Sequence, residues 1–229
     1  MDYDLIIIGA GPAGYVAGIR AGQAGLKTAV IEKKHVGGMC LNWGCIPSKA
    51  MLESAKYFSR LSMASDFGVE GIDPKALSFS WEKGVKRSER IVRRLTKGVE
   101  YLLKKNNVEI ITGSASVESA GTVAVDNRSL TAKNIIIATG SYPGALPFKV
   151  NDKKILNLES FFSMKEIPGK LLVVGSGPVS AEISQLLSLI GKDVTLVKTT
   201  DKVFPQLDDY LNTYIMRRFE SMKIKIIEG

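Results

Sequence analysis

The sequence is poor in the residues that build metal sites and disulfide frameworks. Its 229 residues include only two cysteines, Cys40 and Cys45, and one histidine, His35. A structural zinc site needs about four Cys or His ligands, so no metal site is expected. Two cysteines are too few for a secreted fold held together by disulfides, because such folds are rich in paired cysteines. We expect His35 to be a surface loop residue rather than a catalytic base.

Long hydrophobic runs and a targeting leader are also missing. No apolar run approaches the roughly 20 residues that a membrane-spanning helix needs. The N-terminus enters a strand pattern at Tyr3 with no basic leader or cleavage site, which gives no support for secretion or organelle import. With 45% hydrophobic residues the chain has the composition of a globular protein. These features predict a cytoplasmic protein of one large or two small domains, without a membrane partner.

The formal net charge of +8 is concentrated in one segment. Its basic residues are Lys83, Lys86, Arg87, Arg90, Arg93, Arg94, Lys97, Lys104 and Lys105. Such a cluster can bind nucleic-acid phosphates, but no aromatic residues interleave with the charges to stack bases. Apolar Ile91, Leu95, Val99 and Leu102 recur at helical spacing, which predicts an amphipathic helix with a solvated basic face. We therefore expect no nucleic-acid partner, although this face can still dock an acidic protein.

The N-terminal 32 residues have the pattern of a complete strand–helix–strand unit. Residues 5–8 are all apolar, as in a parallel strand buried on both faces. A glycine-rich turn over 9–14 and a helical pattern to Ala24 follow, and then a strand over 28–31 ends in Glu32. This is the βαβ arrangement of a dinucleotide-binding fold.

The same plan returns about 165 residues later. An apolar strand over 171–174 leads into a glycine-rich turn over 175–180, a helix through Ile190 and a strand over 194–197. The sequence thus predicts an α/β protein with two Rossmann-like units, each binding one dinucleotide. The break over 140–144 places a boundary between a domain of residues 1–143 and an incomplete domain of residues 144–229.

The segment between the two units is predicted to contain two helices and several short strands. A helix runs from Pro47 to about Ser62, because proline suits a first helical turn. Residues 63–80 look irregular, and a long helix covers about 81–105. The expected strands are residues 108–111, a short one around 117, 122–125 and 135–138.

The first glycine-rich turn has every part of a dinucleotide fingerprint. Gly9 permits the tight turn, Gly11 lets the backbone approach a pyrophosphate, and Gly14 allows close packing of the helix. The helix N-terminus offers amide donors to phosphates, and Glu32 is placed to accept hydrogen bonds from ribose hydroxyls. The alternative is a glycine-rich turn with no ligand.

The two cysteines lie just after this unit, at the start of the predicted helix. There the helix dipole favours a thiolate at Cys45, which can donate charge to an electron-poor ring, while Cys40 in the preceding loop is expected to be more open to an incoming thiol. Lys49 lies one turn beyond Cys45 and can reach the same ligand. The pair therefore favours redox chemistry over metal binding.

These residues carry a family resemblance that covers essentially the entire chain. GAGPAG at the N-terminus, Glu32, the segment GGMCLNWGCIPSK and the ATG at residues 138–140 are similar to the class I flavin-disulfide oxidoreductases. Within them, the segment most resembles the dihydrolipoamide dehydrogenases, whose motif reads GGTCLNVGCIPSK. The resemblance implies an enzyme that passes electrons between a dithiol substrate, a Cys40–Cys45 pair, FAD and NAD.

The resemblance also implies roles for individual residues. Cys45 would be the charge-transfer thiol beside the flavin, and Cys40 the interchange thiol that attacks disulfide substrates. The implied FAD contacts are Gly9, Gly11, Pro12, Ala13, Gly14, Glu32, Lys33, Gly38, Met39, Lys49, Ala115, Ala138, Thr139 and Gly140. The implied NAD contacts are Gly175, Gly177, Pro178, Val179 and Glu182, and Lys198 stands at the further cofactor-binding position after the second strand. The expected partners are a lipoyl-bearing protein or a small disulfide substrate, and a second subunit of a homodimer.

Several positions depart from the family pattern. Met39 stands where the family has Thr, and Trp43 replaces a small apolar residue between the cysteines. In the second fingerprint the third glycine is Ser180, and the acid expected after the strand is Lys198. A cation at that position can receive a 2′-phosphate, with Lys202 as a second contact, so NADP is possible.

Length is the largest departure, because family members are roughly twice this size. Their later segments include a second FAD-contacting stretch and an interface domain with a His-Glu base, so a fragment or truncated form is expected. Two alternatives stay open. One is an NADPH-dependent disulfide or metal-ion reductase of the same superfamily, of the glutathione or mercuric reductase type. The other is a non-catalytic nucleotide-binding module.

Overall fold

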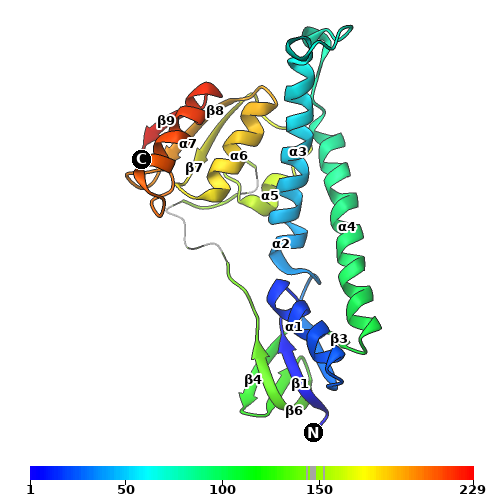
Figure 1. Ribbon diagram of the computed structural model, residues 1–229. Coiled ribbons are helices and arrows are strands. Elements are labelled where there is room, and N and C mark those ends of the chain that lie inside the picture. The colour runs from blue at the N-terminus through cyan, green and yellow to red at the C-terminus, as the bar shows by residue number, and fades with distance from the viewer. Residues whose placement is uncertain (143, 145–147, 152) are drawn as a thin grey trace. The chain divides into compact units, whose positions relative to one another are not determined.

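The computed structural model describes residues 1–142, 144, 148–151 and 153–229. They form two compact units (Figure 1). Unit 1 comprises Met1–Pro47 and Glu89–Phe162, and unit 2 comprises Ser48–Ser88 and Ser163–Gly229. The predicted domain boundary falls at Pro143, which lies outside the described residues, so the boundary stays a prediction.

Unit 1 is built on a six-stranded sheet with the order β3-β2-β1-β6-β5-β4. Strands β3, β2, β1 and β6 run parallel, and β6, β5 and β4 form an antiparallel meander. The strands are β1 (Tyr3–Ile8), β2 (Thr28–Glu32), β3 (Glu109–Thr112), β4 (Ala115–Ser119), β5 (Thr122–Val125) and β6 (Arg128–Ile137). The helices that begin in this unit are α1 (Pro12–Gln23), α2 (Gly38–Asn42), α3 (Cys45–Ser62) and α5 (Leu158–Phe162).

Both faces of the central strand β1 are buried, as its unbroken apolar run predicts. Because side chains alternate along a strand, Ile7 joins the cluster that contains Val99 and Leu103, whereas Ile6 joins the cluster that contains Val123 and Val125. Helices therefore cover one face of the parallel sheet and the meander covers the other. The glycine-rich turn leaves β1 at its carboxyl end, where ligands bind in folds of this type.

Unit 2 contains a three-stranded parallel sheet with the order β7-β8-β9. The strands are β7 (Lys170–Val174), β8 (Asp193–Lys198) and β9 (Lys225–Glu228). Its helices are α6 (Pro178–Leu189), α7 (Asp209–Ser221) and the short 3-10 helices η1 (Ala64–Phe67) and η2 (Pro74–Ala76). The two β-α-β units predicted from the sequence are thus present, one in each compact unit.

Helix α4 (Trp81–Lys105) has the predicted bounds, but its buried face differs from the prediction. Val99 and Leu103 are buried, whereas Leu95 and Leu102 are exposed. The basic side chains are exposed along the helix, as expected, with Arg87 as the exception: it donates hydrogen bonds to the Ala50 carbonyl (2.9 Å) and the Ser54 hydroxyl (3.2 Å). Within the described ranges, no helix is both long and apolar enough to cross a bilayer.

Candidate dinucleotide and redox sites

The first glycine-rich turn is shaped by steric limits at Gly9 and Gly14. Gly9 has φ of +104°, and its N–H donates to the Ile31 carbonyl at 2.7 Å. A Cβ on Gly9 would lie 2.3 Å from the Ala138 oxygen, and one on Gly14 would lie 1.8 Å from the Gly9 oxygen. Only glycine fits at either position, so the turn and helix α1 pack as the fingerprint predicts.

The start of helix α1 is open to a ligand. Gly11 is its N-cap and makes no side-chain capping bond, and Pro12 occupies the first turn. A Cβ on Gly11 would meet nothing closer than the Gly38 Cα, at 3.9 Å. The amides of this turn and the positive end of the helix dipole can therefore hold an anionic phosphate against the backbone.

Glu32 ties the end of β2 to the same turn. Its carboxylate accepts hydrogen bonds from the Ala10 N–H (2.8 Å), the Lys34 N–H (3.0 Å) and the His35 N–H (3.3 Å). Two oxygens with about four lone-pair sites leave capacity for a ribose hydroxyl. Together with the open helix start, these residues fit the adenosine and pyrophosphate parts of a dinucleotide.

The cysteine segment is anchored to this turn through two glycines. The Gly37 N–H donates to the Ala10 carbonyl at 2.8 Å. Gly38 has φ of +61°, and a Cβ there would lie 2.7 Å from the Gly11 Cα. Any larger residue at position 38 would push α2 away from the glycine-rich turn, so the cysteine segment and this turn pack as one structure.

The positions of the two cysteines correct part of the sequence analysis. Cys40 lies within helix α2, not in a loop, and Cys45 is the first residue of α3. Cys45 is exposed and Cys40 is half-buried, so the expectation that Cys40 is the more open of the two is wrong. Gly44 allows the chain to pack closely against α2, because a Cβ at this position would lie 2.9 Å from the Met39 oxygen and 3.3 Å from the Cys40 Cα.

The aromatic and histidine side chains of this segment face each other. His35 lies in an exposed loop, as predicted, and its ring meets Trp43 edge-on with the centroids 5.8 Å apart. Met39 is exposed on α2. Across the described part of the chain, no group of three or more His, Cys, Asp or Glu side chains is arranged to hold a metal ion.

The remaining predicted FAD residues in unit 1 lie at strand ends or in the first turn of α1. The Ala138 N–H donates to the Ile8 carbonyl at 2.8 Å, and Thr139 and Gly140 follow it at the surface. Ala115 begins β4. Pro12 and Ala13 are exposed in the first turn of α1.

Lys33 has a partner that the sequence analysis missed. Its ammonium group donates a hydrogen bond to the Tyr142 hydroxyl, 109 residues away in the chain. Tyr142 follows the ATG segment, so its proximity to the end of β2 depends on the pairing of β6 beside β1. No local pattern in the sequence indicates that contact.

Lys49 and Glu182 form an ion pair within unit 2. The Lys49 ammonium lies 2.6 and 2.7 Å from the two Glu182 carboxylate oxygens. Lys49 is on α3 and Glu182 on α6, so the structure joins two residues that the sequence analysis assigned to different cofactors. Because the Lys49 and Glu182 side chains are 58% and 33% exposed, their ion pair contributes little to the stability of the fold and serves mainly to orient the two side chains.

The second glycine-rich turn repeats the backbone of the first. Gly175 has φ of +139°, and its N–H donates to the Val197 carbonyl at 2.9 Å. Gly177 is the N-cap of α6, and Pro178 and Val179 are exposed in its first turn. Ser180, in place of the third glycine, is buried and its hydroxyl donates to the Gly177 carbonyl at 2.8 Å.

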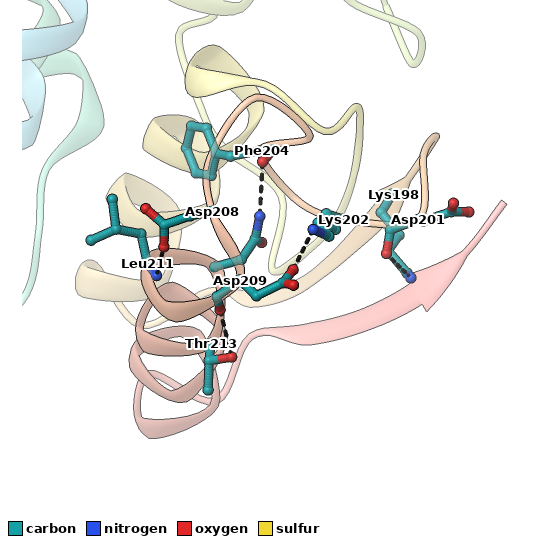
Figure 2. A network of polar contacts seen from close by, with 9 residues as sticks. Lys198, Asp201, Lys202, Phe204, Asp208, Asp209, Leu211 and Thr213 are labelled. Atoms are coloured by element: carbon teal, nitrogen blue, oxygen red, sulfur yellow. Dashed lines mark hydrogen bonds and ion pairs between the residues drawn. The ribbon is translucent and has the colours of Figure 1, made fainter.

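Lys198 ends strand β8 and is held at both sides. Its ammonium group lies 2.7 Å from a Glu228 carboxylate oxygen and donates to the Asp201 carbonyl at 2.7 Å. Figure 2 shows the contact of Lys198 with Asp201 near the pair formed by Lys202 and Asp209. The pKa of Glu228 is lowered by its hydrogen bond to Lys198 and by the charge of that lysine.

Comparison with known proteins shows the family of the chain. The model of the pyridine nucleotide-disulphide oxidoreductase family matches residues 3–229. The dihydrolipoyl dehydrogenase of Acholeplasma laidlawii is 38% identical over 231 residues, which cover 99% of this chain and 68% of that protein. That of Bacillus subtilis is 36% identical over 227 residues, covering 97% of this chain and 49% of its own length.

Solved structures show the same fold. LpdA from Mycobacterium tuberculosis superposes with a TM-score of 0.86 at 24% identity over 98% of this chain and 51% of its own. The HOCl-induced flavoprotein disulfide reductase RclA from Escherichia coli gives a TM-score of 0.83 at 23% identity, covering 99% and 49%. The chain thus spans about half the length of most of these relatives. By its sequence match over nearly all its residues, the chain belongs to the pyridine nucleotide-disulphide oxidoreductase family.

Proposed function

We propose that this chain carries the flavin and redox-disulfide centre of a dihydrolipoamide dehydrogenase-like oxidoreductase. The proposal rests on one observation: the Cys40–Cys45 segment is anchored to the first dinucleotide turn by the Gly37–Ala10 hydrogen bond and the close approach of Gly38 to Gly11. A redox pair attached to a dinucleotide site is the arrangement that dithiol oxidation by a flavin requires.

In this proposal the residues of unit 1 hold FAD. The amides at the start of α1 bind its pyrophosphate, and Glu32 binds its adenosine ribose. When bound, FAD supplies the electron relay between the dithiol and a pyridine nucleotide. Unit 2 holds that pyridine nucleotide at the start of α6, with Glu182 toward the nicotinamide.

The proposed thiol chemistry uses Cys40 and Cys45 in sequence. A substrate thiolate attacks the Cys40 sulfur of a Cys40–Cys45 disulfide, and the S–S bond breaks to release Cys45 as a thiolate. The second substrate thiol then attacks the mixed disulfide, which frees Cys40 and leaves the substrate oxidised to its disulfide. The positive end of helix α3 stabilises the negative charge on the leaving Cys45 sulfur.

The partners that follow are a lipoyl-bearing protein or a small disulfide and, in the full-length family form, a second subunit. A second candidate function, an NADPH-dependent disulfide or metal-ion reductase of the same superfamily, is favoured by Lys198 at the end of β8. The cytoplasmic location expected from the sequence stays a prediction.

The test is reconstitution of Cys40→Ser and Cys45→Ser with FAD, two matched variants that each keep one thiol, with spectra recorded while that thiol is reduced and the flavin is oxidised. We expect the chain to retain flavin colour. We also expect Cys40→Ser, but not Cys45→Ser, to show a long-wavelength charge-transfer band, which full reduction of the flavin should abolish because the oxidised flavin is the acceptor. A long-wavelength band in Cys45→Ser would contradict the assigned roles. A chain with native circular dichroism that retains no FAD would contradict the proposal and favour the non-catalytic module.

A further inference from the structure

The two dinucleotide units place opposite charges at one equivalent position. Gly9 bonds to Ile31 and Gly175 bonds to Val197 through the same backbone hydrogen bond. The residue that follows each acceptor is Glu32 in unit 1 and Lys198 in unit 2. This is the position whose carboxylate accepts the ribose 2′-hydroxyl of NAD in folds of this type.

In unit 2 the link between the strand end and the glycine-rich turn is made by Ser176 and not by residue 198. In unit 1, Glu32 accepts the Ala10 N–H and so ties the strand end to the turn. In unit 2, Ser176 replaces Ala10, and its buried hydroxyl accepts the N–H groups of Thr199 (2.8 Å) and Thr200 (3.2 Å). The link between turn and strand is therefore kept without an acid at position 198.

Position 198 itself offers no ribose acceptor. A lysine ammonium has three donors and no acceptor, so it cannot accept a hydrogen bond from a ribose hydroxyl. The nearby carboxylate of Glu228 is paired with Lys198, and the Thr200 hydroxyl donates to the Lys202 carbonyl. The end of β8 thus carries a cation at the position where NAD finds its carboxylate acceptor.

The cation is held in place and its counter-ion is exposed. The Lys198 side chain is 15% exposed, and its ammonium group donates a hydrogen bond to the Asp201 carbonyl in the loop that follows β8. The same loop is tied to the first turn of α7 by Lys202–Asp209 and by Asn212, which donates to the Phe204 carbonyl (Figure 2). Glu228, by contrast, has 84% of its side chain in solvent. A phosphate can displace an exposed carboxylate at small cost.

We infer that unit 2 selects the 2′-phosphorylated pyridine nucleotide, NADP(H), over NAD(H), with Lys198 as the specificity-determining residue and Glu228 as the counter-ion that the 2′-phosphate displaces. The inference rests on the proposed function only in assigning the pyridine nucleotide to unit 2. Lys198 is a point charge that bonds the phosphate dianion, and Lys202 adds a second cation from the same loop.

The test measures dissociation constants of NADPH and NADH for the chain by isothermal titration calorimetry, with 2′,5′-ADP and 5′-AMP as the corresponding half-ligands. We expect NADPH to bind about ten- to hundredfold more tightly than NADH, the range for one charge-assisted hydrogen bond. Lys198→Glu restores an acceptor, so the preference should reverse. Lys165→Glu, an equal charge change on an exposed residue of unit 2, should keep the preference of the unaltered chain.

Glu228→Gln supplies a test that does not remove the cation. It should tighten NADPH binding about two- to fivefold and leave NADH binding unchanged, because the phosphate no longer competes with a carboxylate. Equal affinity for the two dinucleotides, tighter binding of NADH, or no binding of either by a natively folded chain would overturn the inference. Because none of these readouts needs FAD or the cysteines, failure here is distinguishable from failure of the flavin-disulfide proposal.

Discussion

The two dinucleotide units share their backbone plan and differ in the sign of their charges. The two units have the same strand pairing, equivalent turns at Gly9 and Gly175, and a helix after each turn. The hydrogen bond from the Gly113 N–H to the Glu32 carbonyl in unit 1 is repeated in unit 2 from the Gly229 N–H to the Lys198 carbonyl. At four register-equivalent positions the charge is inverted. The pairs are Asp4 and Lys170, Lys27 and Asp193, Glu32 and Lys198, and Glu109 and Lys225. Apolar strands and glycine turns therefore specify the fold, and charges at strand ends are left to specify the ligand.

The first strands of the two units also differ in burial. Strand β1 lies between β2 and β6 and is buried over its last four residues. Strand β7 pairs only with β8 among the strands that the structure describes, and Leu172 (63%) and Val174 (42%) are exposed. Layers on both faces bury the side chains of β1, whereas Leu172 and Val174 alternate onto one face of β7 that the described residues leave exposed.

The largest expected difference between the units lies at the third fingerprint position. Gly14→Ala should destabilise the chain by about 3 kcal/mol or more, because the new Cβ would collide with the Gly9 oxygen. Ser180→Ala, its counterpart in unit 2, should cost about 1 kcal/mol for the lost hydrogen bond. Urea unfolding followed by circular dichroism measures both. Equal costs would show that the two turns are packed alike.

A smaller effect is expected where turn and strand end are joined. Glu32→Ala and Ser176→Ala should each destabilise by about 1–3 kcal/mol, because each leaves backbone N–H groups without their acceptor. Hydrogen exchange locates the damage: the Ala10 amide should lose protection in the first variant, and the Thr199 amide in the second. Unchanged protection of Thr199 in Ser176→Ala would break the proposed equivalence.

The ion pair of Lys49 and Glu182 has no counterpart in unit 1, where the position equivalent to Glu182 on α1 is Val16. Because both side chains are partly exposed, we expect a double-mutant cycle of Lys49→Met and Glu182→Gln to give a coupling of less than about 1 kcal/mol. Coupling above that value would mean that the pair stabilises unit 2 and does more than orient Lys49.

The smallest effect concerns Tyr3, whose equivalent in unit 2 is Gly169. Burial, and then its hydrogen bond to Glu109 at 2.7 Å, raises the pKa of Tyr3 from 10.0 to about 12. The folded chain keeps a proton that the unfolded chain releases, so stability from this group is present below pH 10.0 and is lost as pH rises toward about 12. Ultraviolet titration should show one late-titrating tyrosine that Tyr3→Phe removes and the control Tyr101→Phe keeps.

Patterns that depend on neighbours in sequence could be predicted, and patterns that depend on tertiary contacts could not. The bounds of α4 and the apolar strands β1 and β7 follow from periodicity and composition. The helical stripe predicts Leu102 as buried, but Leu103 continues the same stripe and only the packing against the sheet selects between them. Helix α2 is five residues long, too short for its period to be detected, so the sequence predicts a loop at Cys40.

The hydroxyl of Ser176 has an evolutionary consequence. On the proposed roles, substitution of Glu32 in unit 1 affects both the link between turn and strand and the recognition of the ribose, so the position is constrained twice. In unit 2 Ser176 makes that link, and residue 198 combines its proposed role in recognition only with its contacts to Glu228 and the Asp201 carbonyl. A single codon can then change the proposed nucleotide preference of unit 2 while the turn stays joined to the strand, which makes this site the more evolvable of the two.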